Sequence, residues 1–150
     1  MVEFHKNYAE VIYNSKHEGA VIIWKDYTTD DQFQEVYENA LNLASEYICK
    51  CWIEEMGQGK TVPSSSVNWV INEFFARLAN TSVRKVAFLI ERNVMRKLYV
   101  ESVLESIKMS GLQVKCFNTR LEMEQWIKES KTIMPNFNKA SMYNDFNQYY

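Results

Sequence analysis

Two short apolar runs constrain the fold of this chain more than any other feature. Residues 20–24 read AVIIW and residues 86–90 read VAFLI, with no polar residue inside either run. A strand with one face in water alternates apolar and polar side chains, whereas a strand covered on both faces does not. The two runs therefore predict central strands of a sheet with helices on both faces.

Helical patterns and shorter strand-like segments fill the rest of the chain. Residues 29–32 have the form of a capping box, which predicts the start of a helix. Apolar residues recur at spacings of three and four within residues 33–47, 67–78, 94–107 and 123–127, and strand-like segments cover residues 8–14, 48–53 and 112–117. The order β-β-α-β-α-β-α-β-α predicts a single-domain α/β fold with a mostly parallel, five-stranded sheet whose first strand is antiparallel to its neighbour.

We assign residues 1–130 to this domain and residues 131–150 to a C-terminal tail rich in Asn and aromatic residues. The tail shows no helical or strand period, which predicts a disordered terminus. The alternative is an arm whose aromatic side chains dock on this subunit or on a neighbouring one.

Charge and composition exclude several classes of protein. The chain has 17 Lys and Arg against 19 Asp and Glu, a net charge of −2. It has no basic excess to neutralise a phosphate backbone, so we expect no nucleic-acid binding. The longest apolar runs are far shorter than the ~20 residues of a membrane span, so none is expected. The N-terminus carries Glu3 and Glu10 and no signal-peptide core, which predicts a cytoplasmic location.

Three cysteines, Cys49, Cys51 and Cys116, lie in strand-like segments. An odd number in such positions is typical of reduced thiols that pack as small apolar side chains. The chain has only two histidines, His5 and His17, which is poor material for a zinc site. We therefore expect no metal and no cofactor.

A series of short motifs runs along residues 8–128 in an informative order. They are Ile23-Trp24, Thr28-Thr29-Asp30 with Phe33, Trp52-Ile53, Trp69-Val70-Ile71-Asn72-Glu73, Lys85-Val86-Ala87, Cys116-Phe117 and Glu124-Gln125-Trp126-Ile127. In this order the chain resembles the SpoIIAA-like domains, a group related to the STAS domains of anti-sigma-factor antagonists. The resemblance implies a sheet with helices on both faces, a cytoplasmic location, and a role in protein partnering or, as in relatives, in binding apolar ligands.

The same resemblance draws attention to Ser64, Ser65 and Ser66. In STAS-type antagonists a phosphorylatable Ser opens the helix after the third strand, usually within an Asp-Ser-Ser-Gly-like motif. The corresponding stretch here lacks the Asp and the Gly, and the sequence leaves phosphorylation open. Their position also predicts that these serines cap the helix, because a side-chain oxygen can accept from its free amides.

The segment Gly57-Gln58-Gly59-Lys60-Thr61 is similar to a phosphate-binding loop. That pattern needs a Gly at the position of Glu54, and it places the Lys-Thr pair directly at a helix start. Here Pro63 and three serines intervene, so we interpret the segment as a mobile surface loop. Glu54 and Glu55 are adjacent and should point to opposite sides, both solvated. We expect neither nucleotide binding nor any other enzymatic activity.

Trp69 indicates where a working surface could lie. The apolar stripe of its helix centres near Val67, and Trp69 falls roughly 160 to 200° away, which predicts an exposed indole. The surface expected around it comprises Glu55, Gly57, Gly59, Ser64, Ser65, Ser66 and Trp69, after the carboxyl end of a strand. The function expected is a non-catalytic interaction or regulatory module that binds a protein partner or a second copy of itself. The alternative is a small apolar ligand held between sheet and helices.

Overall fold

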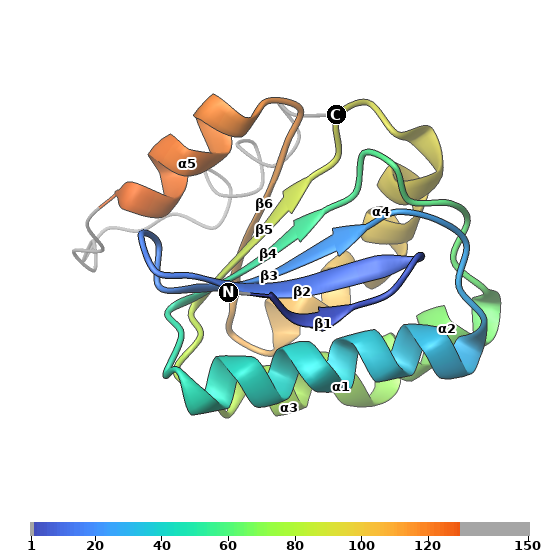
Figure 1. Ribbon diagram of the computed structural model, residues 1–150, viewed down its shortest axis with the longest axis horizontal. Coiled ribbons are helices and arrows are strands. Elements are labelled where there is room, and N and C mark those ends of the chain that lie inside the picture. The colour runs from blue at the N-terminus through green and yellow to red at the C-terminus, as the bar shows by residue number, and fades with distance from the viewer. Residues whose placement is uncertain (1, 130–150) are drawn as a thin grey trace.

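The computed structural model of this chain describes residues 2–129 and shows an α/β fold (Figure 1). The strands are β1 (Val2–His5), β2 (Ala9–Asn14), β3 (Gly19–Trp24), β4 (Cys51–Glu55), β5 (Lys85–Leu89) and β6 (Gln113–Phe117). The helices are α1 (Asp30–Glu46), α2 (Ser64–Trp69), the π-helical η1 (Val70–Phe74), α3 (Phe75–Ala79), α4 (Val94–Met109) and α5 (Arg120–Lys128).

The sheet has six strands in the order β1-β2-β3-β4-β5-β6 and is mixed. β1, β2 and β3 are antiparallel neighbours, while β3, β4, β5 and β6 run parallel. The prediction of five strands is wrong, because it omits β1. That strand has four residues at the sheet edge, too few to show an alternating pattern, and its pairing with β2 defines it.

Two apolar layers lie on the two faces of the sheet. Right-handed crossovers between parallel strands in sequential order place the connecting helices on one face, where α1, α3 and α4 enclose the larger core with Trp24 and Trp52. α5 lies on the other face (Figure 1), where Met123 and Trp126 pack with Ile53 and Phe117. The central strands predicted from residues 20–24 and 86–90 lie inside this sheet.

Helix starts follow their local sequence signals. Thr29 Oγ1 accepts a hydrogen bond from the Gln32 amide, and Gln32 Oε1 accepts one from the Thr29 amide, which confirms the capping box of α1. Thr119 caps α5 in the same way, since its hydroxyl accepts from the Glu122 amide. Gly111, with φ +88°, takes a left-handed conformation just after α4, where glycine is favoured.

The helical segment after β4 departs from the predicted single helix. Between α2 and α3 the backbone forms a π-helical turn, η1, whose wider turn changes the angle between successive side chains. Ile71, expected on the buried stripe, is 39% exposed, whereas Phe74 and Phe75 are both buried. Trp69, expected to be exposed, is half-buried, because Tyr37 and Phe74 lie against its ring.

No helix within residues 2–129 has both the length and the apolar character needed to cross a bilayer. In that same part of the chain, no three His, Cys, Asp or Glu side chains are grouped so that they could hold a metal ion. The tail prediction for residues 131–150 falls outside the described residues.

Candidate functional site

The carboxyl ends of the four parallel strands lie at one edge of the sheet, on the right in Figure 1. We call it the carboxyl edge; residues 25–29, 56–63, 90–93 and 118–119 form its loops. Open α/β sheets place their ligand sites at this edge. The surface predicted from the sequence lies mainly here.

The loop of residues 56–63 is fixed by the start of α4. Asn93 Nδ2 donates hydrogen bonds to the carbonyls of Met56 at 2.7 Å and Gly59 at 2.8 Å. Its Oδ1 accepts from the Arg96 amide and so caps α4. Arg96 Nε donates to the Lys60 carbonyl at 2.8 Å. The loop predicted to be mobile is thus held to the start of α4 by hydrogen bonds from the Asn93 and Arg96 side chains to its backbone.

Gly59 is required by close packing rather than by phosphate binding. A Cβ atom at this position would lie 2.7 Å from Arg96 Nε and 2.8 Å from Arg96 Cζ. Arg96 is fully buried, and its guanidinium carbon lies 4.7 Å from the centroid of a Trp24 ring. The loop backbone thus closes over a buried cation that contacts an aromatic ring.

Glu54 is buried in the helix-side core. The prediction that it is solvated is therefore wrong. Its carboxylate accepts hydrogen bonds from Trp24 Nε1 at 2.9 Å, Trp52 Nε1 at 2.9 Å and the Tyr37 hydroxyl at 2.8 Å. Because that hydroxyl uses its hydrogen on Glu54, the Tyr99 hydroxyl, 2.7 Å away, donates to Tyr37. Alternation along β4 does place Glu54 and Glu55 on opposite faces, as expected.

The electrostatics of this cluster indicate a structural role. Burial raises the pKa of Glu54, while hydrogen bonds from Trp52, Trp24 and Tyr37 and the charge of Arg96 oppose that rise. Burial also raises the pKa values of Tyr37 and Tyr99 well above their ordinary value. All three groups are enclosed in the core, so the network supports the carboxyl edge from beneath without facing a substrate.

The predicted serines bind Asp30, the first residue of α1. Ser65 and Ser66 hydroxyls each donate to the Asp30 carboxylate at 2.5 Å, joining α2 to α1. These bonds, first from Ser65 and then from Ser66, lower the pKa of Asp30. The capping role predicted for the serines is wrong, because Pro63 occupies the cap position and all three lie inside the first turn of α2.

The structure brings some of the predicted surface together and separates the rest. Glu55 points away from the serines and forms a two-point ion pair with Arg120, at 2.8 and 3.0 Å. Gly57 packs beside the Glu91 side chain, and Ser64 is exposed in the first turn of α2. Of the predicted residues, Ser64 and Ser65 are exposed, whereas Ser66 is buried and Trp69 lies against the core.

The apolar side chains at this edge were not predicted. Val94, Met95 and Leu98 of α4, with Tyr27 before α1 and Leu121 of α5, are each more than half exposed. We call these five residues the carboxyl-edge patch. Val94 and Leu98 are one helical turn apart with Met95 beside them, and the Thr61 hydroxyl donates to Met95 Sδ at 2.9 Å. The signal for them in α4 was the apolar pair Val94 and Met95 at the start of the helix, with Leu98 one turn after Val94.

Aromatic rings fill the layer between the sheet and α1. Ring centroids are 5.2 Å apart for Trp24 and Phe33, 4.7 Å for Phe33 and Tyr37, 4.6 Å for Tyr37 and Phe74, and 5.3 Å for Phe74 and Trp52. A small apolar ligand in this layer stays a prediction, and these rings are the side chains it would have to displace.

No family model matches this chain, and neither a curated protein nor a solved structure matches it.

Proposed function

We propose that this protein is a non-catalytic interaction module, which binds another protein through the carboxyl-edge patch. The observation that carries the proposal is the concentration of exposed apolar residues at the carboxyl edge of the sheet. Eight large apolar side chains are exposed among those the structure describes, and five of them belong to this patch. Single exposed apolar residues are ordinary, whereas a cluster of them is typical of an interaction surface.

The support beneath the patch favours binding. Asn93 and Arg96 tie the loop of residues 56–63 to α4, and the Glu54 network fixes the strand from which that loop leaves. A surface that is ordered before it binds loses less conformational entropy on association. The patch is therefore preorganised for a partner.

A second copy of this chain is the partner we propose. The exposed charges of the carboxyl-edge loops are Asp26, Lys60, Glu91 and Arg92, two acidic and two basic. In a twofold dimer the same surface of each copy faces the other copy. Charges of a single sign around that surface would repel their equivalents, whereas charges of both signs can form ion pairs across the interface. The proposed dimer rests on the carboxyl-edge patch and agrees with the partnering role that the SpoIIAA-like resemblance implies.

Sedimentation velocity over a range of concentrations tests the proposal. Met95→Glu places a charge within the patch, whereas Met109→Glu makes the same change at the other end of α4, where Met109 is 79% exposed. We expect a reversible dimer whose dissociation constant rises at least about tenfold in Met95→Glu and stays unchanged in Met109→Glu. A wild-type chain that remains monomeric at every concentration would refute self-association.

A further inference from the structure

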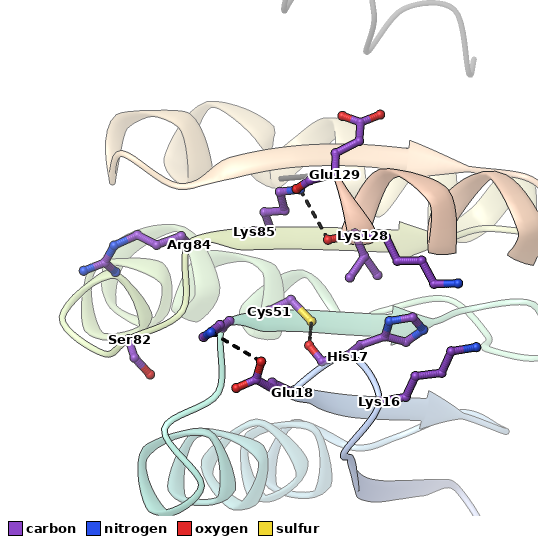
Figure 2. Close-up of a pocket in the computed structure, with 11 residues that line it drawn as sticks. Lys16, His17, Glu18, Cys51, Ser82, Arg84, Lys85, Lys128 and Glu129 are labelled. Carbon is purple, nitrogen blue, oxygen red and sulfur yellow. Dashed lines mark hydrogen bonds and ion pairs between the residues drawn. The ribbon is translucent and has the colours of Figure 1, made fainter. Parts of the chain in front are cut away.

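A pocket lies at the amino edge of the sheet, opposite the carboxyl-edge patch. Its volume is about 550 Å³, and it is formed by the turn between β2 and β3, the starts of β4 and β5, and the end of α5 (Figure 2). This size is within the range of pockets that hold small molecules. The pocket shares no residue with the carboxyl-edge patch.

The pocket is strongly basic in a chain that is slightly acidic. Five basic side chains line it: Lys16, Lys50, Arg84, Lys85 and Lys128. Two carboxylates, Glu18 and Glu129, also line it, so the positive charges exceed the negative ones by three. The whole chain has a net charge of −2. The excess charge therefore favours an anionic ligand in this pocket.

Three of the basic side chains are used by the protein itself. Lys50 forms an ion pair with Glu18 at 3.3 Å. Arg84 Nη1 donates to the carbonyls of Thr81 and Val83. Lys85 Nζ donates to the Trp126 carbonyl at 2.7 Å and thereby closes the end of α5.

Lys16 and Lys128 are different. Both are exposed, and neither forms an ion pair or a side-chain hydrogen bond with any side chain described within residues 4–129. They come from opposite sides of the pocket, one from the turn after β2 and the other from the end of α5. In Figure 2 both side chains extend in the same direction, one on each side of the His17 imidazole.

His17 supplies an unsatisfied donor between these lysines. Its side chain is only 3% exposed, and Nε2 has no hydrogen-bond partner in the described part of the chain. The nearest carboxylate oxygen, Glu124 Oε2, lies 3.6 Å away, too far for a hydrogen bond. A buried polar atom without a partner costs free energy, and a ligand that accepts from it would remove that cost.

We propose that this pocket binds the phosphate group of a small phosphomonoester. A phosphomonoester presents three terminal oxygens, and Lys16 Nζ, Lys128 Nζ and His17 Nε2 supply three donors around one end of the pocket. The remaining volume takes the organic part of the ligand. This site lies at the opposite edge from the carboxyl-edge patch, so either proposal can fail without the other.

Calorimetry of the full chain in a low-salt buffer without phosphate tests the site. The probes are inorganic phosphate, ribose 5-phosphate and, as the neutral control, ribose. Lys16→Gln/Lys128→Gln removes the two unpaired lysines, and Lys6→Gln/Lys60→Gln removes the same charge from exposed residues at the carboxyl edge. Both phosphates should bind saturably and ribose should not. Tighter binding of ribose 5-phosphate than of inorganic phosphate would support a phosphomonoester ligand. Equal binding of the two would show that the pocket recognises free phosphate alone and would overturn the proposal of a phosphomonoester.

The affinity for phosphate should fall at least about tenfold in Lys16→Gln/Lys128→Gln and stay unchanged in Lys6→Gln/Lys60→Gln. The His17 imidazole resonances should shift on addition of phosphate to the wild-type chain. Absence of saturable binding, or an equal loss in both double variants, would overturn the proposal. A loss confined to Lys6→Gln/Lys60→Gln would move phosphate to the carboxyl edge and would also overturn it.

Discussion

The indole Nε1 of Trp24 donates a 2.9 Å hydrogen bond to the buried carboxylate of Glu54. The ring of the same Trp24 contacts the guanidinium of Arg96, so one side chain joins a buried anion and a buried cation that form no direct ion pair. This arrangement links β3, β4 and α4 beneath the carboxyl edge.

Glu54→Gln should destabilise the protein by about 2–4 kcal/mol. A Gln amide has one donor group, which would face a donor from Trp24, Trp52 or Tyr37, and Arg96 would lose its buried counter-charge. Urea denaturation measures the change in the free energy of unfolding.

The neighbouring residue provides the control for this prediction. Glu55→Gln removes an ion pair with Arg120, whose side chain is half exposed, and should cost less than about 1 kcal/mol. If Glu54→Gln were as mild as Glu55→Gln, the buried network would not support the fold as described.

The sequence predicts the centre of this fold better than its edges. Residues 20–24 have enough continuous apolar character to identify a doubly covered strand, whereas β1 depends on pairing with β2. The sequence pattern predicts a solvated Glu54 after the strand-like segment of residues 48–53, although alternation with Trp52 along β4 places both side chains on the helix side. Trp69 could not be placed, because a helical wheel of constant angle does not include the π-helical turn that follows it.

The carboxyl-edge patch shows a different limit of sequence interpretation. The apolar residues of α4 lie on several sides of the helix. Sequence interpretation assigns to the core the side that carries most of them, here the side of Val100, Val103 and Ile107. Val94 and Leu98 then look like ordinary helix residues. Only the packing of α4 against the sheet separates the exposed residues from the buried ones.

The Asp30 carboxyl should titrate below its ordinary pKa, because Ser65 and Ser66 donate to its charged form. A lowered pKa in the folded state means that its stabilising contribution is present above the unfolded pKa and is lost as the pH falls through the folded pKa. Ser65→Ala should raise the titration midpoint of the Asp30 carboxyl carbon in an NMR experiment. Ser64→Ala should leave it unchanged, and equal midpoints in all three proteins would show that the bonds to Asp30 are absent in solution.

Cys49 and Cys51 should react slowly with thiol reagents in the native protein. Burial raises the pKa of Cys49 to about 11 and that of Cys51 to about 12, and both thiols are enclosed by the fold. The thiolate is the reactive species, so at pH 8 only a minute fraction of either residue is reactive. Peptide mass spectrometry after iodoacetamide treatment should find both unmodified in native protein and alkylated in urea. Rapid alkylation of the native protein at pH 8 would contradict this burial.

The location of the interface can be measured directly by dilution. Amide ¹H–¹⁵N spectra recorded at decreasing concentrations follow each residue as a dimer dissociates. We expect the largest shifts at the loop of residues 56–63 and at the five residues of the carboxyl-edge patch, Tyr27, Val94, Met95, Leu98 and Leu121. Ile48 and Met109, which are also exposed, should not change. Shifts centred on the amino edge or on β1, or spectra that do not depend on concentration, would contradict the claim that this protein associates through its carboxyl edge.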